Sequence, residues 1–280
     1  MPADREPNEQ MLLWNGHAGQ TWTDLQETLD RLFRPIESDL VSCSRSLSPK
    51  TILDVGCGTG ATTLAIARVL EPQSTCLGMD ISEPMIALAR RRARAAGLNA
   101  RFITADAEHF ALEPSSFDLV VSRFGVMFFA DPVKAFANLR KSTVAGGQLQ
   151  VYAWRSPAEN PFMTAAERAA APLLPAMPKR VPDAPGQFAF SNDTKVRDIL
   201  EQSGWSNVQI RPVDFSLILP LSELESYYTR MGSVGRILEQ LEQSVRSQVL
   251  EAVRPAFDEF VEGDQVRFDA ACWLITAAAV

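Results

Sequence analysis

The chain has 280 residues, 46% of them apolar, with a formal net charge of −7 and a pI of about 5.0, which suits one large α/β domain with a sizeable core. The acidic balance argues against a nucleic-acid partner, because domains that bind phosphate backbones are usually basic. The sequence contains no run of about 18 or more apolar residues, so we expect no membrane span.

The first 48 residues predict a helical segment that precedes the main domain. Residues 20–47 have a helical pattern, and the stretch 14–19 just before them carries His17. The first residues are polar and acidic and lack the apolar core of a signal peptide. We therefore expect residues 1–48 to lie outside the central sheet.

The most informative motif of the chain is Thr-Ile-Leu-Asp-Val-Gly-Cys-Gly-Thr-Gly at residues 51–60. Its apolar run predicts a buried parallel strand, which breaks at three alternate glycines and leads into a helical pattern at 61–70. Glycine permits positive φ and a close approach of ligand to backbone, and a helix start offers free N–H groups. The motif therefore predicts a nucleotide-binding corner.

Two interpretations of this corner compete. Gly56, Gly58 and Ala61 satisfy the dinucleotide pattern G-x-G-x-x-G/A, and Asp80 stands at the end of a second predicted strand. The corner also resembles the D-x-G-x-G-x-G turn of class I S-adenosylmethionine (SAM) methyltransferases. Asp54 favours the second interpretation, because a carboxylate repels a pyrophosphate but attracts the sulfonium and ammonium cations of SAM.

Strands alternate with helices through the rest of the first half. The patterns predict strands at 76–80, 99–106, 117–124 and 148–154, with helices that begin at Ser82 and Asp131 between them. Such alternation implies a parallel, doubly wound sheet.

The C-terminal half is expected to complete the sheet. Residues 155–191 are rich in proline and alanine and predict a lid or connector. Residues 192–280 predict, in order, a helix at 193–202, a sixth strand at 208–219, a helical insertion at 221–262 and a seventh strand at 266–278. The insertion would cap a substrate pocket or form a dimer face.

Residues 49–154, including the block Ser-Arg-Phe-Gly-Val-Met-Phe-Phe-Ala-Asp at 122–131, resemble the ubiquinone/menaquinone C-methyltransferase family. The resemblance implies a SAM-binding, Rossmann-like core with a seven-stranded sheet, mostly parallel, whose last strand is antiparallel. It also implies that residues 1–48 fold over the pocket as a cover segment. These motifs indicate cofactor and fold but not the acceptor.

The resemblance and the strand ends together give a set of expected cofactor-binding residues. Asp80 would bind the ribose hydroxyls, Asp106 the adenine amino group and Asp54 the ammonium group, although Asp80 and Asp106 could instead cap turns or helices. Ile81 would stack on adenine, or belong to the core. The full expected set is Asp54, Gly56, Gly58, Gly60, Asp80, Ile81, Asp106, Ala107 and Ser122.

Two residues are candidates for a catalytic role. His17 could act as a general base, because imidazole titrates near neutral pH, or it could be an exposed loop residue. Arg123 ends the fourth strand and could bind a carboxylate of a ligand or pair with a loop acid. Phe124, Phe128 and Phe129 could wall a methyl-transfer site or lie in the core. No metal-binding pattern is evident in the sequence.

We predict a SAM-dependent methyltransferase that acts on a small, partly apolar organic acceptor through an oxygen, carbon or nitrogen nucleophile. The methyl group would move by in-line displacement in a dry pocket, leaving S-adenosylhomocysteine. An NAD(P)-dependent oxidoreductase and a non-catalytic SAM-binding partner or sensor are the alternatives. Four widely spaced cysteines without a C-x-x-C pair predict reduced thiols and a cytoplasmic protein. If the helical insertion forms a dimer face, the protein is a homodimer.

Overall fold

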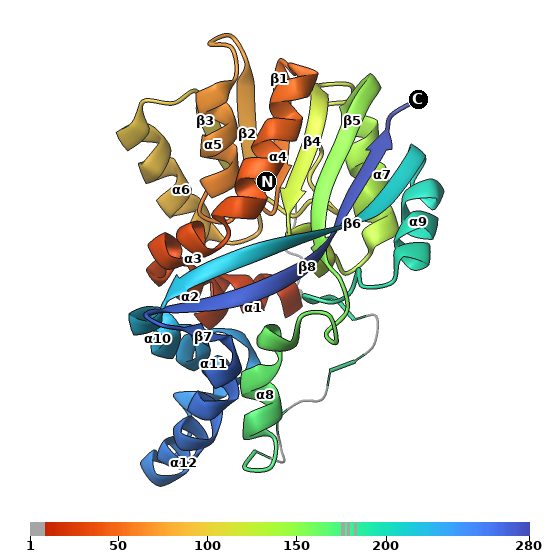
Figure 1. The fold of residues 1–280 in the computed structure, drawn as a ribbon. Helices are drawn as coiled ribbons and strands as arrows, with labels where there is room; N and C mark the ends of the chain where they lie inside the picture. The colour runs from red at the N-terminus through yellow and green to blue at the C-terminus, as the bar shows by residue number, and fades with distance from the viewer. Residues whose placement is uncertain (1–8, 175–176, 178–179, 182–183) are drawn as a thin grey trace.

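The computed structural model describes residues 9–174, 177, 180–181 and 184–280, and these form one mixed sheet flanked by helices (Figure 1). The strand order is β3-β2-β1-β4-β5-β8-β6, and a short β7 pairs with β8. The strands are β1 (Thr51–Val55), β2 (Thr75–Asp80), β3 (Ala100–Thr104), β4 (Phe117–Arg123), β5 (Thr143–Trp154), β6 (Ser206–Pro220), β7 (Val261–Glu262) and β8 (Gln265–Ala278).

The pairing confirms the expected mostly parallel sheet with an antiparallel last strand. The pairs β1–β2, β1–β4, β2–β3 and β4–β5 are parallel, whereas β8 runs antiparallel to both β5 and β6. The sheet has one strand more than the seven expected: β7, which contains two residues and pairs only with β8.

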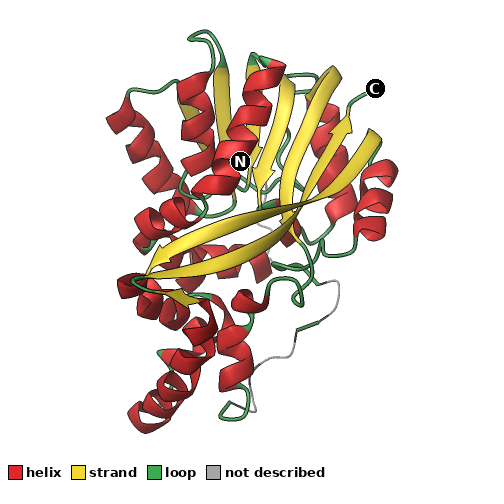
Figure 2. Ribbon diagram, in the orientation of Figure 1, coloured by secondary structure: helices red, strands yellow, loops and turns green. Residues whose placement is uncertain are grey.

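Helices cover both faces of the sheet (Figure 2). Both central strands, β1 and β4, are therefore buried through most of their length, which explains their continuous apolar sequence. The helices are α1 (Glu9–Asn15), α2 (His17–Asp24), α3 (Gln26–Leu32), α4 (Arg34–Leu47), α5 (Ala61–Val69), α6 (Glu83–Ala96), α7 (Pro132–Ser142), α8 (Ala165–Ala170), α9 (Asp193–Gln202), α10 (Leu224–Arg230), α11 (Gly232–Leu238) and α12 (Gln243–Val253), with 3-10 turns η1 (Val126–Phe128), η2 (Pro161–Met163), η3 (Leu221–Glu223) and η4 (Arg254–Phe260).

The long antiparallel pair β6–β8 extends beyond the other strands and determines where the C-terminal helices lie (Figure 1). β6 and β8 remain paired as far as Pro220 and Gln265, whereas β5 leaves β8 at the pair Trp154 and Cys272. The chain from η3 to β7 connects the end of β6 to the start of β8. The extension therefore carries α10 and α11 below the carboxyl ends of the parallel strands.

Several boundaries differ from the sequence predictions. β5 begins at Thr143 rather than 148, so its two glycines lie within the strand, where Ala279, just after β8, supplies backbone partners. Residues 20–47 are divided among α2, α3 and α4, and residues 221–262 are also divided. Met231, in an extended conformation, separates α10 from α11, and Gly232, the first residue of α11, has φ of 72°.

Within the described part of the chain, no helix has both the length and the apolar character that crossing a membrane requires. Part of the expected connector at 155–191 lies outside the described residues, and its described portion contains η2 and α8.

Candidate functional site

A pocket lies at the carboxyl ends of β1, β2 and β4, which is where ligands bind in open α/β sheets. One side consists of the residues at and just after these strand ends, together with those that follow β3. The opposite side comes from the outer segments: Trp14 and Trp22 of the N-terminal helices, and Tyr227 and Arg236 of α10 and α11. The N-terminal helices lie next to the strand ends in Figure 1.

The three glycines after β1 all have positive φ, but each serves a different contact. A Cβ on Gly56 would lie 2.5 Å from Gly125 Cα, so this glycine allows the turns after β1 and β4 to touch. A Cβ on Gly60 would lie 2.9 Å from the Phe102 ring, so Gly60 allows helix-to-sheet packing. At Gly58 the nearest atom would be a methionine sulfur at 3.7 Å, which leaves open space on the pocket side.

Asp80 couples the glycine turn to the end of β2. Its Oδ2 accepts a hydrogen bond from Gly58 N at 2.8 Å, and its Oδ1 accepts one from Ser82 N at 2.9 Å. Burial raises the pKa of this carboxyl, and the two backbone donors oppose the rise. A carboxylate has about four acceptor positions, so Asp80 retains capacity for ligand hydroxyls. The helix cap itself is Ser82, whose Oγ accepts from Met85 N.

Asp106 and Ala107 line the pocket beyond β3, next to Glu108 and His109. Asp106 Oδ1 accepts from Glu108 N, and its Oδ2 lies 2.7 Å from His109 Nδ1. The Glu108 carboxylate accepts from the backbone N–H groups of Ala130 and Asp131. Oxygen and nitrogen atoms of Asp106, Glu108 and His109 lie within 4.8 Å of one another, but each of the three side chains already has a hydrogen-bond partner.

Asp54 lies behind the glycine turn and is outside the pocket lining. Its side chain is 1% exposed; Oδ2 accepts from Thr63 Oγ1 at 2.6 Å, which joins β1 to α5. Its Oδ1 is buried without a hydrogen-bond partner among the described residues. Burial raises the pKa of Asp54 to about 7. A positive charge on a ligand beyond the glycine turn would favour the ionised form of this buried carboxyl.

Ser122 and Arg123 take opposite positions at the end of β4. Ser122 Oγ donates to Val55 O at 2.6 Å and accepts from Gly125 N at 3.1 Å, which ties β4 to β1. Ser122 is fully buried and lies outside the pocket lining, in contrast to the position expected from the sequence. Side chains alternate along a strand, so the next residue, Arg123, is the one that lines the pocket.

His17 lines the pocket from the start of α2. Its Nδ1 lies 3.4 Å from Thr21 Oγ1, and its Nε2 lies 3.5 Å from the Glu239 carboxylate just after α11. The imidazole therefore joins the N-terminal helices to the C-terminal insertion at the pocket edge. Ile81 also lines the pocket, and its carbonyl accepts from Asn15.

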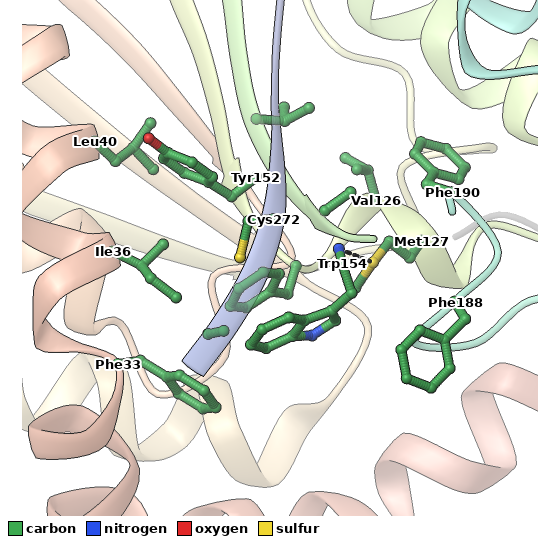
Figure 3. Close-up of a cluster of buried hydrophobic side chains, with 14 of the residues drawn as sticks. Phe33, Ile36, Leu40, Val126, Met127, Tyr152, Trp154, Phe188, Phe190 and Cys272 are labelled. Carbon is green, nitrogen blue, oxygen red and sulfur yellow. Dashed lines mark hydrogen bonds between the residues drawn. The ribbon is translucent and has the colours of Figure 1, made fainter. Parts of the chain in front are cut away.

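Aromatic side chains form a wall that sequence analysis predicted only in part. Phe124 has φ of 67°, unusual for a residue with a side chain, and its ring stacks on Trp154 with centroids 4.1 Å apart. Phe33 packs against both rings, and Trp154 lies between Phe33 and Met127 in Figure 3. Phe128 and Phe129 also line the pocket. Trp154 and Phe33 carried no local signal, because β5 and α4 meet only in the folded chain.

Residues 52–147 match the family model described as a methyltransferase domain. The core of this chain is therefore similar to a methyltransferase domain. It resembles the demethylmenaquinone methyltransferase of Thermus thermophilus, with 38% identity over 41% of this chain and 52% of that protein. It also resembles the aklanonic acid methyltransferase DauC of Streptomyces, with 34% identity over 46% of this chain and 61% of that protein. The matched part thus spans only about half of these curated relatives.

Two solved structures are similar in fold to most of this chain. The YcgJ protein of Bacillus subtilis aligns with a TM-score of 0.56 and 18% identity, over 86% of this chain and 97% of the other. The [4+2]-cyclase SpnF aligns with a TM-score of 0.57 and 17% identity, over 99% and 98%. At this identity the likeness establishes the fold alone, since one fold supports different reactions.

Proposed function

We propose that the protein is a SAM-dependent methyltransferase whose acceptor is a small, partly apolar organic molecule. The observation that carries the proposal is the buried Asp80 carboxylate, held by Gly58 N–H beside the open space at that glycine. The match of residues 52–147 to a methyltransferase domain supports it, as do two relatives whose names refer to small organic acceptors.

Residues in the pocket, and Asp54 behind it, act on different parts of the cofactor. Asp80 accepts hydrogen bonds from the ribose hydroxyls, and Asp106 with the backbone of Ala107 binds the adenine edge. Ile81 packs on the adenine face. The unpaired oxygen of Asp54 stabilises positive charge beyond the glycine turn. When bound, SAM supplies a methyl group already activated on a sulfonium centre.

The protein contributes orientation and exclusion of water to the reaction. The aromatic wall places an apolar acceptor, and the described part of the cover segment, residues 9–48, closes the pocket around it together with the insertion 221–262. A nucleophile that must lose a proton requires a base, and His17 is the imidazole on the pocket lining. The same pocket contribution by α10 and α11 favours a cap over a dimer face for the insertion.

We also propose a cytoplasmic location, which the free thiols of Cys43, Cys57, Cys76 and Cys272 support. The net charge of −7 supports a small-molecule acceptor over nucleic acid.

Calorimetric titration with SAM, S-adenosylhomocysteine and NAD tests the proposal. We expect binding of the first two at low-micromolar concentration and no binding of NAD, because Asp54 disfavours a pyrophosphate beside the turn. Transfer of a labelled methyl group from SAM to members of a panel of aromatic phenols, acids and amines then tests catalysis. Tight NAD binding without a SAM signal would refute the proposed function.

A further inference from the structure

Arg123 has a buried guanidinium nitrogen with no protein partner. Its Nη1 has no hydrogen-bond acceptor among the described residues, although the side chain lines the pocket. Arginine carries five N–H donors and remains charged, and a buried donor without an acceptor destabilises the protein. Of the other arginines that line the pocket, Arg230 has an ion pair with Asp24 and Arg236 is exposed to solvent; the nearby Arg92 has an ion pair with Asp30. Within the described residues, no carboxylate lies within 4.0 Å of Arg123.

The surrounding structure holds Arg123 in a fixed position. Arg123 pairs with Tyr152 in the β4–β5 ladder, and the following Phe124 N donates to Tyr152 O at 3.0 Å. The guanidinium carbon lies 5.4 Å from the Phe33 ring centroid, in cation–π contact. The left-handed backbone of Phe124 is the kind of strain that persists where surrounding contacts determine the conformation, often at ligand sites.

The acids that face Arg123 leave its charge without a close counter-ion. Glu37, from α4, and Asp54, from β1, interact with it electrostatically. Burial raises the pKa of both carboxyls, and in Glu37 the Arg123 charge is the largest opposing influence. Neither approaches within ion-pair distance of the guanidinium. The side of the pocket next to Arg123 is instead aromatic, with Phe33, Phe124 and Trp154.

We propose that Arg123 anchors a carboxylate of a bound ligand inside the pocket. The planar guanidinium matches a carboxylate with two parallel hydrogen bonds, and a partly dry site strengthens them. The carboxylate has two possible sources, the amino-acid end of the cofactor or an acid group on an aromatic acceptor that packs against Phe124 and Trp154. This inference rests on the proposed function and specifies the charge of the ligand that the pocket selects.

The first arm of the test measures the cofactor source. Arg123→Gln removes the positive charge, whereas Arg123→Lys keeps the charge but lacks the planar guanidinium that donates two parallel hydrogen bonds. Arg94→Gln removes one positive charge from the exposed end of α6 and serves as the matched control. S-adenosylhomocysteine is titrated against 5′-methylthioadenosine, which lacks the amino-acid carboxylate. If the cofactor supplies the carboxylate, Arg123→Gln weakens only the former, by about ten- to a hundredfold, with Arg123→Lys in between.

The second arm measures the acceptor source. 2-Naphthoate and its neutral isostere 2-naphthamide are titrated into the protein saturated with S-adenosylhomocysteine. If the acceptor supplies the carboxylate, the parent and Arg94→Gln prefer naphthoate, and Arg123→Gln abolishes the preference by a similar factor. Circular dichroism and thermal melts confirm folding of each variant.

The proposal that Arg123 binds a ligand carboxylate is refuted if neither titration changes. In that case Arg123→Gln and Arg123→Lys both bind S-adenosylhomocysteine like the parent, and naphthoate binds no better than naphthamide to any of these proteins. This outcome is distinct from failure of the proposed function. If no adenosyl ligand binds the folded parent, but the protein alone prefers naphthoate and loses the preference in Arg123→Gln, the anchor stands and the methyltransferase assignment falls.

Discussion

Replacement of Asp80 by alanine should weaken cofactor binding and destabilise the folded protein, for separable reasons. The native carboxylate accepts one hydrogen bond from Gly58 N at 2.8 Å and one from Ser82 N at 2.9 Å, and its remaining acceptor positions serve the two ribose hydroxyls in the proposed complex. Bonds to a charged group contribute about 1.5–3 kcal/mol each. Loss of the two ribose bonds, partly replaced by water, should cost about 2–4 kcal/mol, or roughly a thirtyfold to several hundredfold loss of affinity.

The variant needs a control that removes a comparable structural carboxylate elsewhere. Asp118 Oδ2 accepts from the backbone N–H groups of Lys50 and Thr51, at the opposite end of β1 from the pocket. Asp118→Ala should therefore lower the free energy of unfolding, as Asp80→Ala does, yet leave the affinity of the folded protein for S-adenosylhomocysteine unchanged.

Calorimetric titration of parent, Asp80→Ala and Asp118→Ala with S-adenosylhomocysteine, at a temperature where urea melts show all three folded, separates the two effects. Equal affinity of folded Asp80→Ala and parent would refute the assignment of the ribose site. An equal loss in both variants would show that the loss follows destabilisation rather than a direct contact.

Three further predictions concern the glycine turn, the buried acid and the cover. Gly58→Val should abolish S-adenosylhomocysteine binding in titrations while circular dichroism stays native, because φ is 55° and a branched side chain would occupy the open space. Burial raises the Asp54 pKa from 3.8 to about 7, so the folded state without ligand retains a proton that the unfolded state releases, and stability should fall as pH rises from about 4 to about 7. Asp54→Asn should flatten that slope in urea melts, and an unchanged slope would contradict the shift. Glu223, which accepts from Thr28 Oγ1 and pairs with Arg31, links α3 to the insertion. Glu223→Gln should speed hydrogen exchange in α3 and α10 while β1 and β4 keep the parent rate. Unchanged exchange in α3 and α10 would show that Glu223 does not hold these helices together.

The strands and the glycine turn were predictable because their signals are local. A strand buried on both faces must be apolar throughout, and the three glycines mark backbone positions with positive φ. The helix at 193–202 has the expected bounds, because Asn192 caps its first turn through Lys195 N and Gly204 follows its end. These features depend on residues within one turn of each other.

The aromatic side of the pocket and the segments that cover it depend on contacts that no local pattern contains. Thr28 and Glu223 are 195 residues apart in sequence, yet their side chains share a hydrogen bond beside the pocket. Phe33 reaches Trp154 and Arg123 only because α4 packs on the sheet where β4 and β5 end.

The sequence prediction for Ser122 shows the same limit at the scale of one residue. Strand-end position selected both Ser122 and Arg123, but the alternation of side chains directs Ser122 to the backbone of β1 and Arg123 to the pocket. Which of the two faces the ligand depends on the register between β4 and β1, which pairs Asp54 with Val121. Register is a property of the assembled sheet, so the glycine-turn side of the candidate site follows from motifs while the aromatic side requires the structure.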